Sequence, residues 1–342
     1  MSTQALARAA AARPVRLRAG ELVEVRSAAE IMASLDDQGE LDGLPFMPEM
    51  LRYCGYQFTV ASVAHKVCDT VNKSGMYKMT DAVHLVGAAS RCDGSAHDGC
   101  QAACLMYWKT AWLKRVEGTH NAVVPAPGAD EDGPRLLPLL LAHSRREPAE
   151  DGAERHVCQA TEMPRAAPEM LRLLEFGQYV QDVRSGNRRP LWVLGTFLVG
   201  FFNRLQRFSR YRLPRRLRFR EGLDWPFIKG LAARPTPTEV KNLQPGELVR
   251  IRSKEEIMRT LDADQLNRGM GFDGEMSRFC GRTARVARRV NRIIDERTGK
   301  MLTMKSPCVV LEGIVCEGAY NVSCPRAIPP YWREIWLERV AE

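Results

Sequence analysis

The stretch GELVEVRSAAEIMASLD, residues 20–36, recurs as GELVRIRSKEEIMRTLD, residues 246–262. The match continues through a cysteine–glycine pair and two spaced tryptophans, and it covers roughly residues 20–116 and 246–340. Similarity over this length indicates an internal duplication. We therefore expect two copies of one domain.

Each copy has the same local patterns. The segment ELVEVRS alternates apolar and polar residues, which is typical of a half-buried strand. The following SAAEIMASLD predicts a short helix, because Ser27 can cap it and Glu30 lies three residues later. QFTVASVAHKV and AVHLVG predict further strands. Trp108 and Trp112, which match Trp332 and Trp336, are spaced for one face of a helical turn and are expected in the core.

Short strands, a long early loop and a glycine before a strand resemble SH3-like or KOW-type barrels. We predict an α+β fold with two SH3-like small β-barrel repeats that carry metal-binding cysteine loops, joined by a central, mainly helical segment. The predicted boundaries are a disordered tail at 1–18, repeat 1 with a Cys/His metal site at 19–117, a linker at 118–150, a helical and arginine-rich segment at 151–232, and repeat 2 with a cysteine metal site at 233–342.

The composition limits the classes of protein to which the chain could belong. Of the 342 residues, 45% are apolar, which is enough for a folded core. The net charge of +9 favours an anionic partner such as nucleic acid, a phosphorylated substrate or acidic lipid. The first residues lack the apolar stretch of a secretory signal, so we expect a cytoplasmic protein with ten reduced cysteines. In that compartment, clustered cysteines favour metal or redox chemistry over disulfides.

The cysteines are the candidate metal ligands. Thiolates are the ligands that zinc, Cu(I) and iron–sulfur clusters prefer. Cys92 and Cys100 of the first copy match Cys316 and Cys324 of the second, whereas other candidate ligands of the first copy lack a counterpart of the same type. Cys104 matches Ile328, His97 matches Asn321, His84 matches Cys308, and Cys158 in HVCQATE is a more distant donor.

The spacing of the cysteines bears on which metal they bind. No Cys-x-x-Cys pair of the zinc-knuckle type occurs, and longer loops with three thiols can hold a [4Fe–4S] cluster. We predict one or two iron–sulfur clusters, with zinc as the alternative and unligated packing cysteines as a third reading. Cys158 would then be a ligand while Gln159, Thr161 or Glu162 faces substrate. In the other reading of that motif, Thr161 caps a helix and Cys158 is buried.

An arginine-rich stretch, RLQRFSRYRLPRRLRFR, follows an apolar run, LWVLGTFLVGFF. The run is too short to span a bilayer, so it predicts a buried helix or, alternatively, an interfacial one. Arginines interleaved with aromatic residues suit phosphate backbones and lipid headgroups alike, and a solvated helix face is the simpler reading. The predicted anion-binding residues are Arg204, Arg207, Arg210, Arg212, Arg215 and Arg216.

With these motifs, the sequence resembles a bacterial family with duplicated, cysteine-containing SH3/KOW-like repeats. The resemblance rests on CDGSAHDGCQAACLMYWK, CQATE and CPRAI, and it excludes the N-terminal tail and the region near 118–150. It implies an association with polysaccharide or natural-product biosynthesis, but it implies no catalytic residue.

No P-loop, dinucleotide-binding or hydrolase motif is present. We expect a metal-dependent biosynthetic protein, with an iron–sulfur site for redox or Lewis-acid chemistry on a small anionic intermediate. A partner biosynthetic protein is a further expectation. The alternative is a zinc-stapled module without catalysis that binds nucleic acid or scaffolds at a membrane surface.

Overall fold

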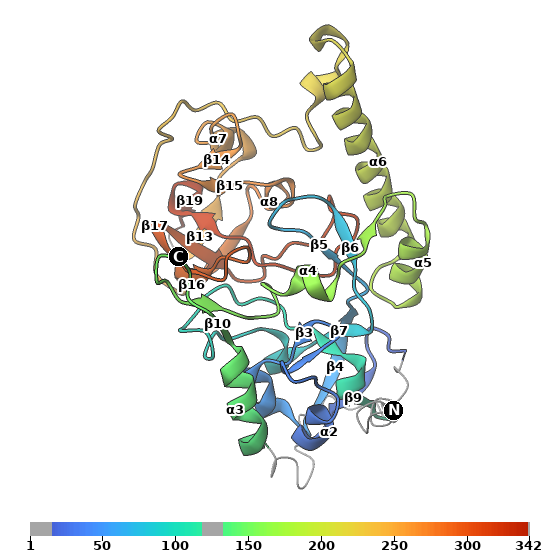
Figure 1. Cartoon of the computed structure of the whole chain (residues 1–342). Helices are drawn as coiled ribbons and strands as arrows, with labels where there is room; N and C mark the ends of the chain where they lie inside the picture. The colour runs from blue at the N-terminus through green and yellow to red at the C-terminus, as the bar shows by residue number, and fades with distance from the viewer. Residues whose placement is uncertain (1–15, 118–132, 341–342) are drawn as a thin grey trace. The chain divides into compact units, whose positions relative to one another are not determined.

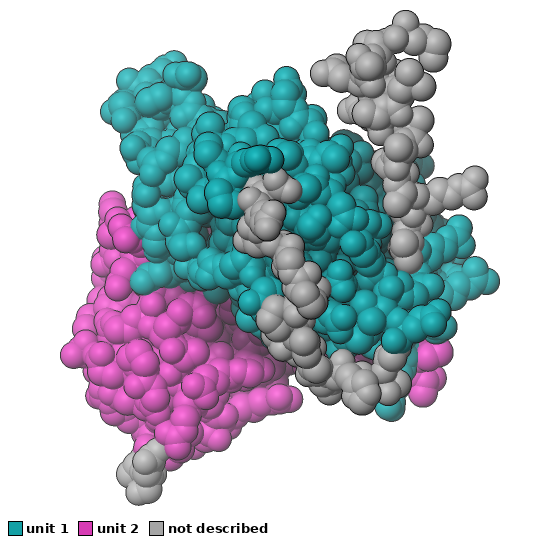
Figure 2. Space-filling view, turned by 90° about the horizontal axis from the view of Figure 1, so that it is seen from below, with its two compact units in different colours: residues 1–189, 293–302 teal, residues 190–292, 303–342 magenta. Residues whose placement is uncertain are grey.

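The computed structural model describes residues 16–117 and 133–340, and it has a mixed α and β composition with small antiparallel sheets (Figure 1). The chain forms two compact units (Figure 2). Unit 1 comprises residues 1–189 and 293–302, and unit 2 comprises residues 190–292 and 303–342. Each unit contains one of the two sequence repeats and its own apolar core.

The main sheet of unit 1 has five antiparallel strands in the order β8-β7-β4-β1-β9. Strand β1 pairs with β4 through Leu22 and Thr59, and with β9 through Val25 and Leu113. A 3₁₀ turn, η3 (Thr110–Trp112), connects β8 to β9. The strands are β1 (Leu22–Val25), β4 (Gln57–Val63), β7 (Ala82–Leu85), β8 (Trp108–Lys109) and β9 (Leu113–Arg115).

The main sheet of unit 2 repeats this arrangement, with the order β18-β17-β16-β13-β19 and the turn η6 (Glu334–Trp336) before the last strand. Identical strand order in both units agrees with the duplication indicated by the sequence. The predicted small β-barrels need correction, because in each sheet the two outer strands remain edges and the described residues form no closed barrel. The strands are β13 (Leu248–Ile251), β16 (Thr283–Ile294), β17 (Met301–Leu311), β18 (Trp332–Arg333) and β19 (Leu337–Arg339).

Short elements surround these sheets. Unit 1 adds α2 (Ala28–Met32), β2 (Glu40–Leu41), β3 (Leu44–Pro45), η1 (Pro48–Tyr53), β5 (Lys66–Cys68), β6 (Met76–Lys78), η2 (Gly87–Ser90), α3 (Gly133–His143), β10 (Arg145–Arg146), β11 (Arg155–His156), α4 (Met163–Ala166), β12 (Met170–Leu171) and α5 (Gly177–Arg184). Unit 2 adds α6 (Pro190–Arg212), η4 (Arg215–Leu217), η5 (Phe219–Gly222), α7 (Lys254–Met258), β14 (Leu266–Asn267), β15 (Met270–Gly271) and α8 (Gly274–Ser277).

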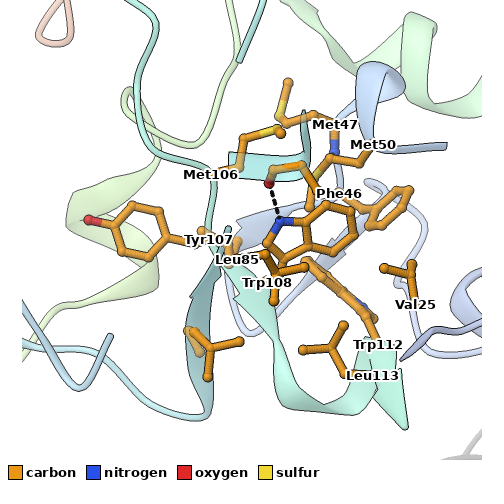
Figure 3. Packing of buried hydrophobic residues seen from close by; sticks show 14 of the residues in the cluster. Val25, Phe46, Met47, Met50, Leu85, Met106, Tyr107, Trp108, Trp112 and Leu113 are labelled. Carbon is orange, nitrogen blue, oxygen red and sulfur yellow. Dashed lines mark hydrogen bonds between the residues drawn. The ribbon is translucent and has the colours of Figure 1, made fainter. Parts of the chain in front are cut away.

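The paired tryptophans form the centre of each core. In unit 1, Trp108 and Trp112 are fully buried and pack edge-to-face on Phe46, with ring centroids 6.1 and 5.1 Å from the phenylalanine (Figure 3). In unit 2, Trp332 and Trp336 are also fully buried and pack on Phe272 at 6.2 and 5.3 Å. The core position predicted for these residues is confirmed. They lie on a strand followed by a 3₁₀ turn and not on one helical turn.

The predicted helix cap is also present in both copies. Ser27 accepts a hydrogen bond from the Glu30 amide, and the Glu30 carboxylate accepts one from the Ser27 amide. Burial acts to raise the pKa of Glu30, but hydrogen bonds from Lys114 and Ser27 outweigh it and lower the pKa from 4.5 to about 2. Ser253 and Glu256 form the same capping box at α7.

Because its pKa is lowered on folding, Glu30 stabilises unit 1 above pH 4.5, and this contribution is lost as the pH falls towards about 2. We expect Glu30→Gln to reduce the free energy of unfolding by about 0.5 kcal/mol at pH 7 and by nothing near pH 2. Urea unfolding over this pH range measures the difference. Glu312→Gln, at an exposed position, is the control, and a Glu30→Gln effect independent of pH contradicts the assignment.

Three predicted boundaries need correction. Residues 1–15 of the predicted tail lie outside the described residues, but Leu17 is buried in the unit 1 core. In the predicted linker, residues 118–132 also lie outside them, whereas α3 buries Leu136 and Leu140 in that core. The Gly, Pro and acidic residues that flank this leucine-rich segment concealed its helical pattern. The predicted central segment is divided, because residues 151–189 belong to unit 1 and residues 190–232 to unit 2.

The apolar run of the central segment is not a buried helix. It forms the first half of α6, which leaves Leu191, Leu194 and Leu198 more than half exposed. The buried face of α6 instead carries Thr196 and Asn203, because these polar side chains have hydrogen-bond partners in unit 2.

Candidate metal centre

The cysteine loop has the same backbone in both copies. In the first copy, the Cys92 amide donates to the carbonyl of Cys104 at 2.9 Å, and in the second, Cys316 donates to Ile328 at 2.8 Å. Gly94 and Gly318 both have a positive φ, and a Cβ atom on either would collide with the backbone of the second loop cysteine. The second copy has neither His97 nor Cys104, so the loop conformation does not depend on those side chains.

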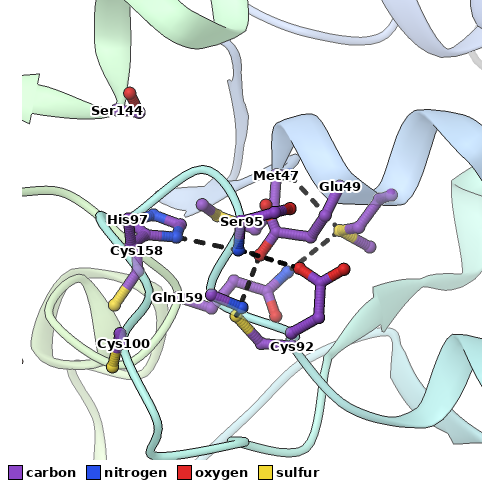
Figure 4. A network of polar contacts seen from close by, with 12 residues as sticks. Met47, Glu49, Cys92, Ser95, His97, Cys100, Ser144, Cys158 and Gln159 are labelled. Atoms are coloured by element: carbon purple, nitrogen blue, oxygen red, sulfur yellow. Dashed lines mark hydrogen bonds and ion pairs between the residues drawn. The ribbon is translucent and has the colours of Figure 1, made fainter. Parts of the chain in front are cut away.

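Three potential ligands meet at the loop of unit 1. The side chains of Glu49, Cys92 and His97 each offer one atom, and these atoms lie within 4.8 Å of one another (Figure 4). The Cys92 thiol donates to Oε1 of Glu49 at 2.9 Å, and Nδ1 of His97 lies 3.8 Å from the same oxygen. The 3₁₀ helix η1 supplies Glu49, and the loop supplies the other two residues.

Two ligand atoms of this group are buried without a hydrogen-bond partner. Nε2 of His97 lies 3.0 Å from the carbonyl of Val157, so in the neutral ring it donates there and Nδ1 keeps its lone pair. Neither Nδ1 of His97 nor Oε2 of Glu49 has a partner, although both residues are at least 96% buried. A buried, unsatisfied polar atom costs about 1–3 kcal/mol, so two such atoms beside one thiol make this group a candidate metal site.

The thiol of this group is protonated in the metal-free state. Burial raises the pKa of Cys92 far above its usual range, and the charge and hydrogen bond of Glu49 raise it further. A bound cation would favour the thiolate, because it would take the place of the thiol proton and neutralise the carboxylate.

The three residues fit a zinc ion by chemistry and spacing. Zinc binds Cys sulfur, His nitrogen and carboxylate oxygen, and a second hydrogen bond from the other histidine nitrogen orients the ring, as Val157 does here. The three side chains would hold the ion through one sulfur, one nitrogen and one oxygen atom. Cys104, whose carbonyl already bonds Cys92, is a candidate fourth ligand, but its sulfur is not one of the grouped atoms.

The other predicted thiols do not join this group. Within residues 16–117 and 133–340, neither Cys92, Cys100 and Cys104 nor Cys308, Cys316 and Cys324 offers three sulfurs within 4.8 Å of one another. The thiol of Cys308 donates to the carbonyl of Val290 at 3.4 Å. His84, its counterpart in the first copy, is buried, with Nδ1 2.9 Å from the carbonyl of Met106.

Cys100 and Cys158 lie beside each other at the edge of the candidate site (Figure 4). Cys100 accepts a hydrogen bond from the amide of Ile294, which also belongs to unit 1. Burial raises the pKa of Cys158 to about 11, and the neighbouring Cys100 contributes to this increase. Neither thiol belongs to a group with two buried atoms that lack a hydrogen-bond partner, as the Cys92 thiol does.

The matching residues of unit 2 do not form such a group among the described residues. Glu275, the counterpart of Glu49, accepts a hydrogen bond from the amide of Tyr320, and burial raises its pKa. Asn321 occupies the position of His97, so no imidazole is available. The candidate group of three residues therefore occurs in the first copy, and the second copy has the same loop backbone without the histidine.

A second group, Asp98, Glu154 and His156, also has ligand atoms within 4.8 Å. Both carboxylates are exposed and form ion pairs with Arg145, at 2.9 and 2.5 Å. Burial lowers the pKa of His156. Because the acids already have a cationic partner, this group is a weaker candidate than Glu49, Cys92 and His97.

The side chains of the CQATE motif make structural contacts within the protein. One prediction was that Gln159, Thr161 or Glu162 faces a substrate. Gln159 is buried and ties two segments together, since its amide group donates to the carbonyls of Pro45 and Tyr107 and accepts from the Tyr107 amide. Glu162 is buried between Arg146 and Arg165. Thr161 bonds back to the main chain of Cys158, and α4 begins two residues later without a side-chain cap.

We expect Gln159→Leu to lower the free energy of unfolding by about 2–4 kcal/mol, because it leaves several buried backbone groups without a partner. Chemical denaturation followed by circular dichroism measures the change. Gln38→Leu, at an exposed glutamine, is the control and should stay within about 0.5 kcal/mol of wild type. A Gln159→Leu protein as stable as this control would contradict the structural role.

The predicted anion-binding arginines divide into two sets. Arg207 and Arg210 form ion pairs with Asp224, as the solvated-face reading expects. The other members are exposed and form no ion pair within the described part of the chain; they are Arg204, Arg212, Arg215 and Arg216.

No protein-family model matches the chain, and no curated protein or solved structure matches it. The suggested bacterial family therefore stays a prediction. Among the described residues, no helix is long and apolar enough to cross a membrane.

Sequence reasoning missed Glu49, the residue that completes the site. A signal was present, since PEM and GEM place a glutamate at the same position of both repeats. Glu49 lies 43 residues before Cys92, so the sequence spacing did not predict that the two side chains meet.

Proposed function

We propose that the protein is a metal-binding module in which one transition-metal ion, zinc before iron, joins Glu49, Cys92 and His97 of the first repeat. The observation that carries this proposal is the pair of buried atoms without a hydrogen-bond partner, Oε2 of Glu49 and Nδ1 of His97, beside a thiol. The second repeat, with Asn321 in place of the histidine, is a scaffold that binds no metal.

The ligand chemistry favours zinc over the iron–sulfur cluster expected from the cysteine spacing. A [4Fe–4S] cluster needs several thiolates, whereas each donor group of the described residues contains at most one thiol. A mixed set of sulfur, nitrogen and oxygen ligands is typical of a single zinc ion.

The surroundings favour a structural site over a catalytic one. Glu49 and His97 are both at least 96% buried, which leaves little room for a substrate beside the ligand atoms. When bound, the ion would supply positive charge that clamps the cysteine loop to η1.

We further infer that each repeat is an SH3-like module. Two features support this inference: the five-stranded order shared by both sheets, and the 3₁₀ turn before the last strand. We also infer a reducing, cytoplasmic environment, in which the ten cysteines would stay as thiols.

Metal analysis of the purified full-length protein tests the proposal. We expect about one zinc ion per chain and no acid-labile sulfide. After exchange with cobalt(II), a thiolate-to-metal absorption band should appear and should be lost in Cys92→Ser but kept in Cys316→Ser. Iron with sulfide would replace the proposal by the iron–sulfur prediction, and a protein that binds no metal after incubation with zinc would refute it.

A further inference from the structure

Helix α6 has an inverted pattern of polar and apolar residues. Its inward face is held by polar contacts within unit 2: Oγ1 of Thr196 lies 2.9 Å from Oγ of Ser323, and Asn203 accepts from the Trp225 amide at 2.7 Å. Gln206 donates to two carbonyls of the segment that follows α6. These contacts fix which face of the helix points outwards.

The outward face carries a continuous apolar stripe. Its members are spaced by three and four residues, which places them on one side of the helix. They are between 41% and 83% exposed, which is unusual for so many large apolar side chains in a row. The stripe consists of Leu191, Leu194, Leu198, Phe201, Leu205 and Phe208.

Positive charge accompanies this stripe. Residues 183–220 contain no aspartate or glutamate, whereas eight arginines lie between residues 204 and 220. The nearest acids that follow, Glu221 and Asp224, already form ion pairs with Lys229 and with Arg207 and Arg210. The exposed Arg204, Arg212, Arg215 and Arg216 therefore keep their charge available for an external anion.

We propose that α6 and η4 form a membrane-binding arm that lies in the surface of an anionic lipid bilayer. The apolar stripe would enter the acyl boundary while the arginines contact lipid phosphates, as in interfacial amphipathic helices. The helix has 23 residues and is about 34 Å long, which suits a position parallel to the surface. No helix of the described chain could cross the bilayer, so the contact is peripheral.

Other occupants of this face fit less well. A second copy of α6 would bring two acid-free, arginine-rich segments together, and like charges oppose that pairing. Nucleic acid would satisfy the arginines but would leave Leu191, Leu194 and Leu198 in water. The inference does not depend on the metal site, because α6 belongs to unit 2 and the ligands belong to unit 1.

Flotation of the full-length protein with phosphatidylcholine vesicles, with and without phosphatidylserine, tests the arm. We expect binding to the anionic vesicles and at least about tenfold weaker binding to neutral ones. Leu194→Glu/Leu198→Glu should abolish binding, whereas Val240→Glu, at an exposed apolar residue outside the arm, should not.

Charge is tested separately. The quadruple alanine variant of Arg204, Arg212, Arg215 and Arg216 should lose about tenfold or more in partitioning. A charge-matched control replaces four exposed arginines outside the arm, namely Arg172, Arg259, Arg282 and Arg297.

A third measurement does not require a loss of function. Phe208→Trp should show a blue shift of tryptophan emission with anionic vesicles, and Val240→Trp should not. Equal binding by the stripe variant and Val240→Glu would overturn the proposal. Failure to bind anionic vesicles would also overturn it, as would a preference for duplex DNA that the stripe variant retains.

Discussion

Replacing His97 by asparagine is expected to reduce the bound zinc from about one ion per chain to almost none. The change introduces the residue that the second repeat has at this position, Asn321, so the loop backbone already accommodates it. It removes Nδ1, the buried nitrogen that lies 3.8 Å from Glu49, and leaves only two ligands. Metal analysis after dialysis against a weak chelator measures the loss.

Stability distinguishes loss of a ligand from loss of the fold. Because zinc binds the folded state, it adds about 4 kcal/mol to the free energy of unfolding at a free concentration about 1,000 times its Kd. A strong chelator should remove this increment from wild type and change nothing in His97→Asn. Asn321→His in unit 2 is the reciprocal control and should bind no second ion, because Glu275 is held by Tyr320. A His97→Asn protein that keeps its zinc refutes the assignment.

Truncating the central tryptophans is expected to have the largest effect on the fold. Trp112 and Trp336 are both fully buried, and each packs edge-to-face on a phenylalanine. Trp112→Ala and Trp336→Ala should each lower the free energy of unfolding by about 3–5 kcal/mol. Amide hydrogen exchange should locate the loss in the β1–β4 pair for the first variant and in the β13–β16 pair for the second.

Conservative variants separate packing from hydrogen bonding in this matched pair. Nε1 of Trp336 donates to Thr260 at 2.9 Å, whereas Nε1 of Trp112 is buried without a partner. Phenylalanine at position 336 therefore loses a hydrogen bond, but at position 112 it removes an unsatisfied donor. We expect Trp336→Phe to cost about 1–2 kcal/mol more than Trp112→Phe. Equal costs would mean that packing alone determines both values.

The mixed α and β class and the duplication were predictable, because the sequence pattern occurs twice. The predicted closed barrels were wrong, because the outer strands of each sheet remain edges. Alternating residues predicted the first strand, and Ser27 with Glu30 predicted the capped helix of the first repeat. Because both copies show the same strand and cap patterns, these patterns could be distinguished from chance matches. Helix α3 was not predicted, because it has no second copy with which its sequence could be compared.

The candidate site was predictable only in part. The sequence of the cysteine loop predicted Cys92 and His97 as metal ligands, and the structure places both beside Glu49. The same reasoning grouped thiols by sequence spacing, but a side chain's direction depends on turn geometry as well as spacing. In the loop, the positive φ of Gly94 turns the chain so that Cys92 and Cys100 have different neighbours.

The duplication was evident from the sequence alone, because the two copies can be compared directly. The first strand and the helix cap of each copy could also be predicted, because they depend on residues within a few positions of one another. The tertiary structure decided two other properties. It brought Glu49 to Cys92 across 43 residues, because η1 packs beside the cysteine loop. It also turned the polar side of α6 inwards, because Ser323 and Trp225 offer hydrogen bonds to Thr196 and Asn203, and this left the leucines outside.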